Sequence, residues 1–511
     1  MGVFLFSVII KKQMNYFKVS KFFLFASVFF IALVSGSTLF PFIVGKYAWF
    51  RTSVDLALIF FLLGLLFYQY KSAEISINQR LSQILKSPLV IAVTIFVAIF
   101  LIACFFGVDP ETSFWSNFER GEGGLQILHL YIFFLLLLIL FREDSDWYKL
   151  FTFSLLAGLL MVLYGIGASL KYADAEITIR YDPEGAMEQI LTGRGGPLYQ
   201  TFKTFIGSRF NEPGFRLYGS IGNPAYVSAY AIFMLFYASY LLIAKYKNRY
   251  RSWGAIFLYL TIAIFISAFI LSATRGAFIG LIAAIIAFAA FYIYSHRTAR
   301  KWVVGGLLSL ILIIGALVYF QNTPFVKAIP GSRIFDISFA TKTFQDRMTM
   351  WKAAIDGFKE RPILGWGPEN FLRVFAHNFN PAYFDPAKGF GAWFDRAHSI
   401  YFDYLAETGM SGFLSYFGIF AVFYWQLLKK TRINTDEKRI DVDKNRNRNI
   451  RINQPDQYKS VFANALLFSL PVAYLVQGAV LFDVLPIYYN NFLFLAFAGY
   501  KLSKQELVNS N

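Results

Sequence analysis

The chain has 511 residues, of which 57% are hydrophobic, 20% are aromatic and only 15% are charged. This composition excludes an ordinary soluble globular protein. The formal net charge of +17 does not indicate a nucleic-acid partner, because the basic side chains gather in short connections between apolar runs, as membrane topology requires. The single cysteine, Cys104, lies inside an apolar run, so neither an intramolecular disulfide nor a thiolate metal site is expected.

Apolar runs recur along the chain, each long enough to cross a hydrocarbon core of about 30 Å as a helix. About twelve runs of this length are present. The sequence therefore predicts an all-α, polytopic membrane protein, with one integral membrane domain over residues 1–511. In chain order, the runs lie near 22–40, 54–70, 88–106, 125–141, 150–170, 224–244, 254–271, 276–295, 302–320, 410–428, 460–481 and 484–500.

The distribution of Lys and Arg predicts the orientation of these runs. Alternate short connections are rich in Lys and Arg, and the most basic of them is the loop at 429–459. The opposite connections are poor in both, and the one at 107–124 holds four acids against Arg120. Basic loops stay in the cytoplasm, so we expect both termini there and the loop at 429–459 beside them.

Two long segments fall on the outer side, at 171–222 and 321–397. Loops of this length usually carry function. The second is predicted to be partly helical, because residues 345–358 have apolar side chains at helical spacing and Arg361-Pro362 would end the helix. Within the basic loop, residues 441–451 are predicted to form a solvated linker.

Four arginines on the outer side are candidates for binding an anion. Arg275 lies in a very short external connection, against the rule that places cations inside. Arg216 precedes a glycine-rich turn that ends at Pro224, where helix-start amides and a guanidinium could bind phosphate. Arg347 lies in the predicted outer helix and Arg120 beside a glycine-rich turn. The plain alternatives are membrane anchoring, an ordinary loop and a solvated helix face.

Of the four histidines, His398 is the candidate for chemistry. Asp395, Arg396 and Glu407 lie close to it in sequence, and Asp403 is about one helical turn further on. A neutral imidazole can take a proton from a hydroxyl nucleophile. The others, His129, His296 and His377, have the settings of structural residues.

Several common catalytic signatures are missing. The sequence contains no Walker P-loop, no G-x-S-x-G elbow and no H-E-x-x-H zinc motif. A reaction on the outer face therefore needs an activated substrate that the lipid delivers, and a lipid diphosphate fits the arginines. No metal and no other cofactor is expected.

Taken in order, several motifs resemble the O-antigen ligase and polymerase superfamily. They are Ser113 to Gly121, Arg216 to Pro224, Thr274 to Ala277, Arg347 to Trp351 with Pro362 to Gly367, and Ala397-His398 with Glu407 to Gly412. The resemblance implies a GT-C-like enzyme of a bacterial inner membrane. Such an enzyme moves a glycan from undecaprenyl diphosphate to an acceptor hydroxyl on the periplasmic face, with inversion and without a metal.

The resemblance also assigns roles to residues. It implies His398 as general base, Arg275 beside the diphosphate and Arg347 as a further catalytic residue of the long outer loop. Arg216 matches another phosphate-contacting arginine. Arg396 and Arg120 are added as candidates for substrate binding, and Asp395 or Glu407 as the carboxylate that orients His398. One departure is Ser399, because the family usually has Asn after the histidine.

The acceptor is left open by the sequence. Ligases use lipid A core or another surface acceptor, polymerases use a second lipid-linked chain, and protein O-oligosaccharyltransferases use Ser or Thr. A ligase is favoured on resemblance alone. A lipid-linked sugar transporter or flippase is the non-enzymatic alternative, but most spans are nearly uncharged, whereas a transport path needs polar side chains within them.

Overall fold

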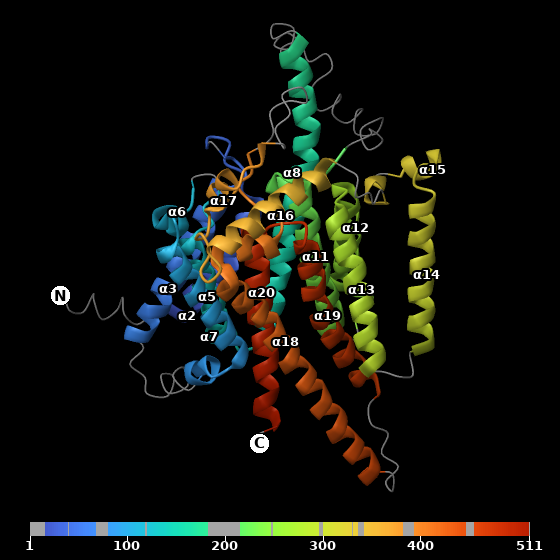
Figure 1. Ribbon diagram of the computed structural model, residues 1–511. Helices are drawn as coiled ribbons and strands as arrows, with labels where there is room; N and C mark the ends of the chain where they lie inside the picture. The colour runs from blue at the N-terminus through green and yellow to red at the C-terminus, as the bar shows by residue number, and fades with distance from the viewer. Residues whose placement is uncertain are drawn as a thin grey trace, which may run out of the picture.

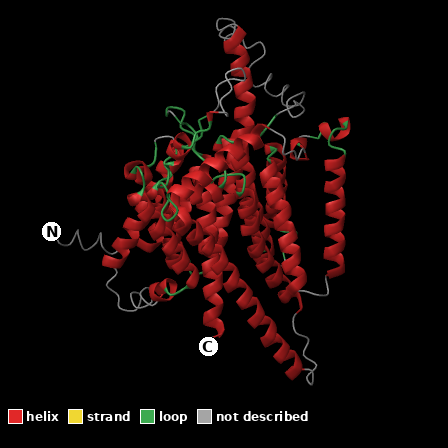
Figure 2. Ribbon diagram, viewed as in Figure 1, coloured by secondary structure: helices red, strands yellow, loops and turns green. Residues whose placement is uncertain are grey.

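The computed structural model describes residues 16–38, 40–67, 80–117, 120–181, 215–246, 249–295, 300–329, 331–335, 342–381, 393–445 and 454–509. In these ranges, helices are the only regular secondary structure (Figure 2). The predicted all-α fold is confirmed.

Most of the helices form one bundle, in which they run roughly side by side (Figure 1). Its core is rich in stacked aromatic rings. For example, Phe151 and Tyr237 stack with centroids 4.5 Å apart, and Phe497 packs on Phe151 at 4.9 Å. The bundle consists of α2 (Tyr16–Ser27), η1 (Val28–Ala32), α3 (Val44–Phe67), α5 (Pro88–Phe106), α7 (Gly124–Leu140), α8 (Asp144–Tyr181), α11 (Pro224–Ala244), α12 (Trp253–Ser272), α13 (Arg275–Ser295), α18 (Ile400–Asn445), α19 (Gln454–Gly478) and α20 (Leu485–Asn509). Helix α14 (Arg300–Tyr319) stands apart from the bundle, beyond α13, and has no buried residue.

Nine helices in the described ranges are long and apolar enough to cross a membrane, so the chain is a multi-pass membrane protein. The remaining predicted runs are also helical but fall outside this group: α2 with η1, α7 with its 17 residues, and α20. The first run lies earlier in the chain than the predicted 22–40, because α2 begins at Tyr16. Its helix ends at Ala32, and the Ser35-Gly36 pair that follows has weak helix propensity.

Short helices cover one end of the bundle (Figure 1). The longest of them is α16 (Lys342–Glu360), which lies across that end and confirms the helix predicted at 345–358. It ends just before Arg361-Pro362, because proline disfavours helical geometry in the residue before it. The others are α6 (Pro110–Trp115), η3 (Gly219–Ile221), α15 (Pro324–Lys327), η5 (Ser332–Phe335) and α17 (Phe371–His377).

A break near the start of α18 receives the turn that follows α16. Gly409 has φ 63° and ψ −166°, so the helix is interrupted there. Trp366 N donates to Ala406 O at 3.0 Å, and Gly367 N donates to Glu407 O at 2.8 Å. A Cβ added at Gly409 would lie 2.4 Å from Ile363 O, so only glycine fits this contact. The break thus holds the turn against the helix that follows His398.

Two of the predicted loops are only partly described. Helix α8 continues to Tyr181, so the expected outer loop at 171–222 begins as helix, and residues 182–214 lie outside the described residues. Helix α18 continues to Asn445, and the first part of the linker expected at 441–451 is therefore helical. The rest of that linker lies outside the described residues.

Candidate active site

His398 lies in the loop directly before α18, with its ring between two aromatic side chains. The ring centroid is 5.0 Å from that of Phe482 and 6.0 Å from that of Phe394, both edge-on. Its Nδ1 is 3.2 Å from the carbonyl oxygen of Arg396. A carbonyl only accepts hydrogen bonds, so this contact requires the proton on Nδ1 and leaves the lone pair on Nε2.

The surroundings of His398 favour the neutral imidazole. Burial lowers its pKa below the ordinary value of 6.5, because the charged form loses solvation. The hydrogen bond to the Arg396 carbonyl and the negative charge of Asp395 oppose this shift, whereas the positive charges of Arg347 and Arg120 add to it. At neutral pH the side chain is therefore an unprotonated base with a defined tautomer.

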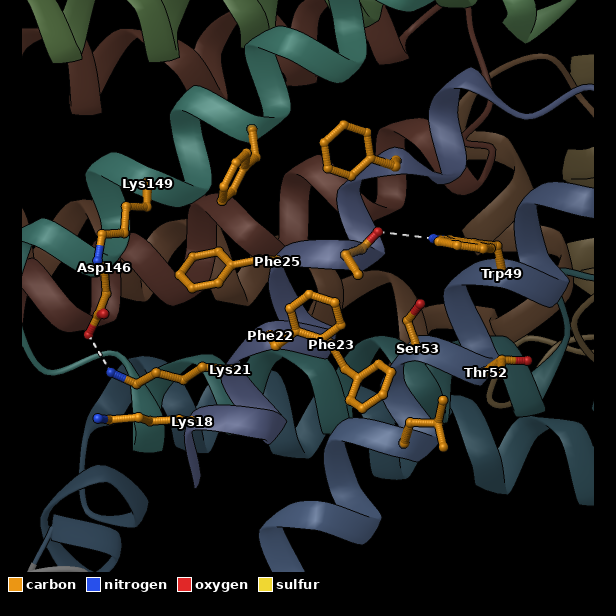
Figure 3. A pocket seen from close by; sticks show the side chains of 14 residues that line it. Lys18, Lys21, Phe22, Phe23, Phe25, Trp49, Thr52, Ser53, Asp146 and Lys149 are labelled. Atoms are coloured by element: carbon orange, nitrogen blue, oxygen red, sulfur yellow. Dashed lines mark hydrogen bonds and ion pairs between the residues drawn. The ribbon is translucent and has the colours of Figure 1, made fainter. Parts of the chain in front are cut away.

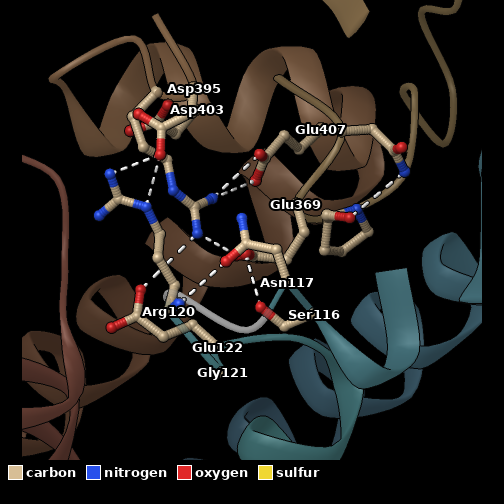
Figure 4. A network of polar contacts seen from close by, with 12 residues as sticks. Ser116, Asn117, Arg120, Gly121, Glu122, Glu369, Asp395, Asp403 and Glu407 are labelled. Carbon is tan, nitrogen blue, oxygen red and sulfur yellow. Dashed lines mark hydrogen bonds and ion pairs between the residues drawn. The ribbon is translucent and has the colours of Figure 1, made fainter. Parts of the chain in front are cut away.

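Arg396 is the centre of a buried network of charges, and Figure 4 shows the carboxyl groups of Glu122, Glu369 and Glu407 that belong to it. Its guanidinium forms ion pairs with Glu369, with Glu407 at 3.0 Å and with Glu122 at 3.6 Å. Burial alone would lower the pKa of Arg396, but these carboxylates raise it well above its ordinary value. Sequence reasoning placed Arg396 at the substrate. In the structure it holds three carboxylates that come from three separate segments of the chain.

The two carboxylates expected to orient His398 are engaged elsewhere. Asp395 pairs with Arg120 at 2.6 Å, and Glu407 pairs with Arg396. Among the described residues, the imidazole instead makes its hydrogen bond to the Arg396 carbonyl. Arg120 also lies over the ring of Phe482, with 4.7 Å from its Cζ to the centroid.

A chain of contacts that ends at His398 contains unusual backbone conformations. In the described ranges, four residues other than glycine have positive φ, and three of them are Ser116, Glu369 and His398, at 67°, 67° and 56°. Ser116 Oγ donates to Glu369 Oε2 at 2.8 Å, and Glu369 Oε1 accepts from Arg396. Left-handed conformations outside glycine each cost about 1–3 kcal/mol and collect at functional sites. Sequence reasoning missed Ser116 and Glu369.

Glu122 completes the network from the loop before α7. Its Oε1 accepts a hydrogen bond from Leu485 N, the first residue of α20, at 2.9 Å. Burial raises the pKa of Glu122 to about 8, and the charge of Glu369 contributes to the increase, while Arg396 and Arg120 oppose it. A second buried carboxyl, Asp483, has its pKa raised by burial to about 7. Both groups can hold a proton near neutral pH.

A separate group of four arginines surrounds the turn between α12 and α13. Arg216 donates to Ser272 O at 3.0 Å and to Thr274 Oγ1 at 3.1 Å. Arg275 Nε donates to the carbonyl oxygen of Arg333 at 3.3 Å. Arg347, on α16, completes the group.

Mutual repulsion shows that these charges lie near one another. Burial lowers the pKa of Arg216, and the charges of Arg333 and Arg275 lower it further. Burial lowers the pKa of Arg347 as well, followed by the charge of Arg275. Arg347 also acts on His398, so it connects the arginines to the imidazole. Sequence reasoning missed Arg333, which resembles many other arginines in loops.

This arrangement can bind an anion beside a base. Four guanidiniums suit the oxygens of a phosphate or diphosphate, because arginine makes paired, charge-assisted hydrogen bonds to such groups. In the structure, Arg347 Nε is buried and has no hydrogen-bond partner among the described residues. In the same ranges, no group of three or more His, Cys, Asp or Glu is placed to hold a metal ion.

The comparisons with known proteins bear on this same region. Residues 260–417 match a family model described as O-Antigen ligase. The matched segment contains Arg275, Arg333, Arg347, Glu369 and His398, whereas Arg216, Ser116 and Glu122 lie outside it. No curated protein matches the chain. The resemblance in the sequence is thus confirmed over its central motifs, because residues 260–417 of this multi-pass membrane protein are similar to the O-antigen ligase family.

Proposed function

We propose that this protein is a glycosyltransferase that moves a glycan from undecaprenyl diphosphate to an acceptor hydroxyl on the periplasmic face of a bacterial inner membrane. The observation that carries the proposal is the group of four arginines electrostatically coupled, through Arg347, to the neutral imidazole of His398. The match of residues 260–417 to the O-antigen ligase family model supports this reaction class. Within it, we propose a ligase that uses lipid A core or another surface acceptor.

The arginines bind the diphosphate of the donor and stabilise the charge that it gains on departure. Arg216 is held by Ser272 and Thr274, so its guanidinium is oriented before the donor arrives. Charged donors that are fixed in place favour the transition state because they need no reorganisation during the reaction. Arg275 and Arg333 serve the same leaving group, and Arg347 lies between it and His398.

His398 serves as the general base. Its Nε2 takes the proton of the acceptor hydroxyl while the hydroxyl oxygen bonds to the anomeric carbon. The bond between that carbon and the diphosphate oxygen breaks on the opposite face, so the configuration inverts. The electron pair leaves with undecaprenyl diphosphate. A positioned base of this kind contributes about 10²- to 10⁴-fold.

The buried network around Arg396 positions this base. Ser116, Glu369 and Arg396 form a chain whose last member supplies the carbonyl that fixes the tautomer of His398. Asp403 supports the same loop, because its Oδ1 accepts from Ala397 N at 2.7 Å. In this proposal Arg396 and Arg120 shape the site instead of holding the glycan.

The test is an assay with purified, reconstituted protein, an undecaprenyl-diphosphate glycan and a lipid A core acceptor. We expect glycan on the core and free undecaprenyl diphosphate, both formed much more slowly by His398→Ala and Arg275→Ala. Longer glycan still on undecaprenyl would identify a polymerase, and glycan on a Ser- or Thr-containing peptide would identify a protein transferase. Glycan that crosses the bilayer while its diphosphate bond stays intact would refute the transferase and support a flippase.

A further inference from the structure

An apolar groove lies between α2, α3 and the start of α8, and its lining contains none of the four arginines (Figure 3). Its volume is about 880 Å³, within the range of about 300–1,000 Å³ that is usual for small-molecule sites. Three segments form its walls: α2 with η1, the first half of α3, and the start of α8. Most of the wall is aromatic or aliphatic, as shown by Phe22, Phe25, Phe29, Trp49, Leu56 and Phe153.

Positive charge gathers at one end of this groove. Lys18, Lys21 and Lys149 line that end against a single acid, Asp146. Lys21 and Asp146 form an ion pair at 2.7 Å that joins α2 to α8. Figure 3 shows Lys18 and Lys21 extending side by side toward the start of α8. The lining therefore has an excess of positive charge next to a hydrophobic channel.

The charged end lies at the opposite end of the bundle from the arginines. Ser220 Oγ, in η3, donates to Ile31 O at 2.5 Å, which places the far end of η1 beside the segment that carries Arg216. Lys18 lies near the start of α2, at the other end of that pair of helices. The predicted topology puts this start, and the connection before α8, in the cytoplasm.

The length of the groove matches one leaflet. Lys18 and Phe29 are eleven residues apart, or about 17 Å at a helical rise of about 1.5 Å per residue. Half of a hydrocarbon core of about 30 Å is about 15 Å. An acyl chain of a phospholipid in the cytoplasmic leaflet would thus run from the lysines to Phe29 and Trp49, whereas a polyprenyl chain is much longer.

We propose that this groove binds one anionic phospholipid of the cytoplasmic leaflet. Its phosphate lies at Lys18 and Lys149, and an acyl chain lies along the aromatic wall. The site is separate from the one that handles the glycan donor. By filling the space between α2, α3 and α8, the lipid stabilises these helices against one another.

The test uses full-length protein purified from nanodiscs that contain phosphatidylglycerol and phosphatidylcholine in equal amounts. Native mass spectrometry counts the lipids that stay bound after stepwise delipidation. We expect one phosphatidylglycerol per chain in the wild type. In Lys18→Gln/Lys149→Gln, retention should fall about 25-fold, because each basic residue near an anionic lipid surface contributes about fivefold in affinity.

Two further variants make the result specific. Arg249→Gln/Arg251→Gln removes two exposed charges from the connection before α12 and should retain the lipid as the wild type does. Ala26→Phe keeps the lysines but adds bulk to the groove wall, and it should also lose the lipid.

Equal retention of both lipids, or equal loss in the arginine control, would overturn the proposal in favour of ordinary annular lipid. Recovery of a polyprenyl diphosphate that Ala26→Phe displaces would overturn the assignment of the ligand. None of these readouts depends on glycan transfer.

Discussion

Replacing Glu369 by Gln tests whether the buried network acts through His398. The side chain of Glu369 is only 3% exposed, and it joins Ser116 to Arg396. Glutamine keeps the shape and can still accept from Ser116, but it loses the charge. Arg396 retains its contacts with Glu407 and Glu122, so the fold should persist.

The expected effect follows from two free energies of similar size. A hydrogen bond to a charged group contributes about 1.5–3 kcal/mol, and the left-handed backbone at His398 costs about 1–3 kcal/mol. The free energy lost when the Glu369–Arg396 hydrogen bond is weakened is therefore about as large as the cost of the left-handed backbone at His398. At about 1.4 kcal/mol per factor of ten, we expect kcat to fall about 10- to 100-fold, with the donor KM within about twofold of the wild type.

The assay is steady-state glycan transfer by reconstituted protein, with a double-mutant cycle as the decisive comparison. If Glu369 works by positioning the base, Glu369→Gln should slow the wild type but not His398→Ala. Glu360→Gln is the matched control, because it alters an exposed carboxylate at the end of α16, 3.2 Å from His377, and it should keep wild-type kcat. The reasoning is refuted if Glu369→Gln slows the His398→Ala protein by the same factor.

Three further results are expected. The transfer rate should rise with pH to a plateau, with a midpoint below 6.5, because burial lowers the pKa of His398 and only the neutral imidazole accepts a proton. Arg347→Gln should move the midpoint of the kcat/KM profile upward, since it removes a positive charge that disfavours the imidazolium. Glu122→Gln should raise the melting temperature more at pH 8 than at pH 5. The pKa of Glu122 in the folded protein, about 8, exceeds the ordinary 4.5, so the wild type loses stability as the pH rises from 4.5 to 8. An equal rise in melting temperature at pH 5 and pH 8 would contradict the assignment. Arg333→Ala should raise the donor KM about tenfold, because it removes roughly one charge-assisted hydrogen bond to the donor. Lys327 is an exposed cation nearby, and Lys327→Ala should leave the donor KM unchanged.

The sequence predicted the helices well because each depends on local pattern. Length and apolarity alone located the membrane helices, and apolar spacing located α16 within two or three residues of its ends. The early end of η1 was missed, because a window of apolar residues does not register the short Ser35-Gly36 interruption.

The candidate site was only partly predictable, since its contacts join distant parts of the chain. Arg275 stood out because it breaks a topological rule, and His398 because of its charged neighbours. The partner of Arg396 could not be inferred: Glu369 is 27 residues away in sequence, and nearer acids such as Asp395 were more obvious candidates. Backbone strain at Ser116 leaves no mark in a single sequence, because serine is common in ordinary loops.

The way Arg396 is held has a consequence for engineering. The segment that matches the family model brings Arg396 and His398, but Glu122 comes from the loop before α7 and Phe482 from the turn between α19 and α20. A graft of residues 260–417 into a related scaffold would therefore move Arg396 and His398 without the acid that pairs with Arg396 and the ring that packs against His398. An exchange of this site between relatives would have to transplant three stretches together, and these would have to be optimised as one unit.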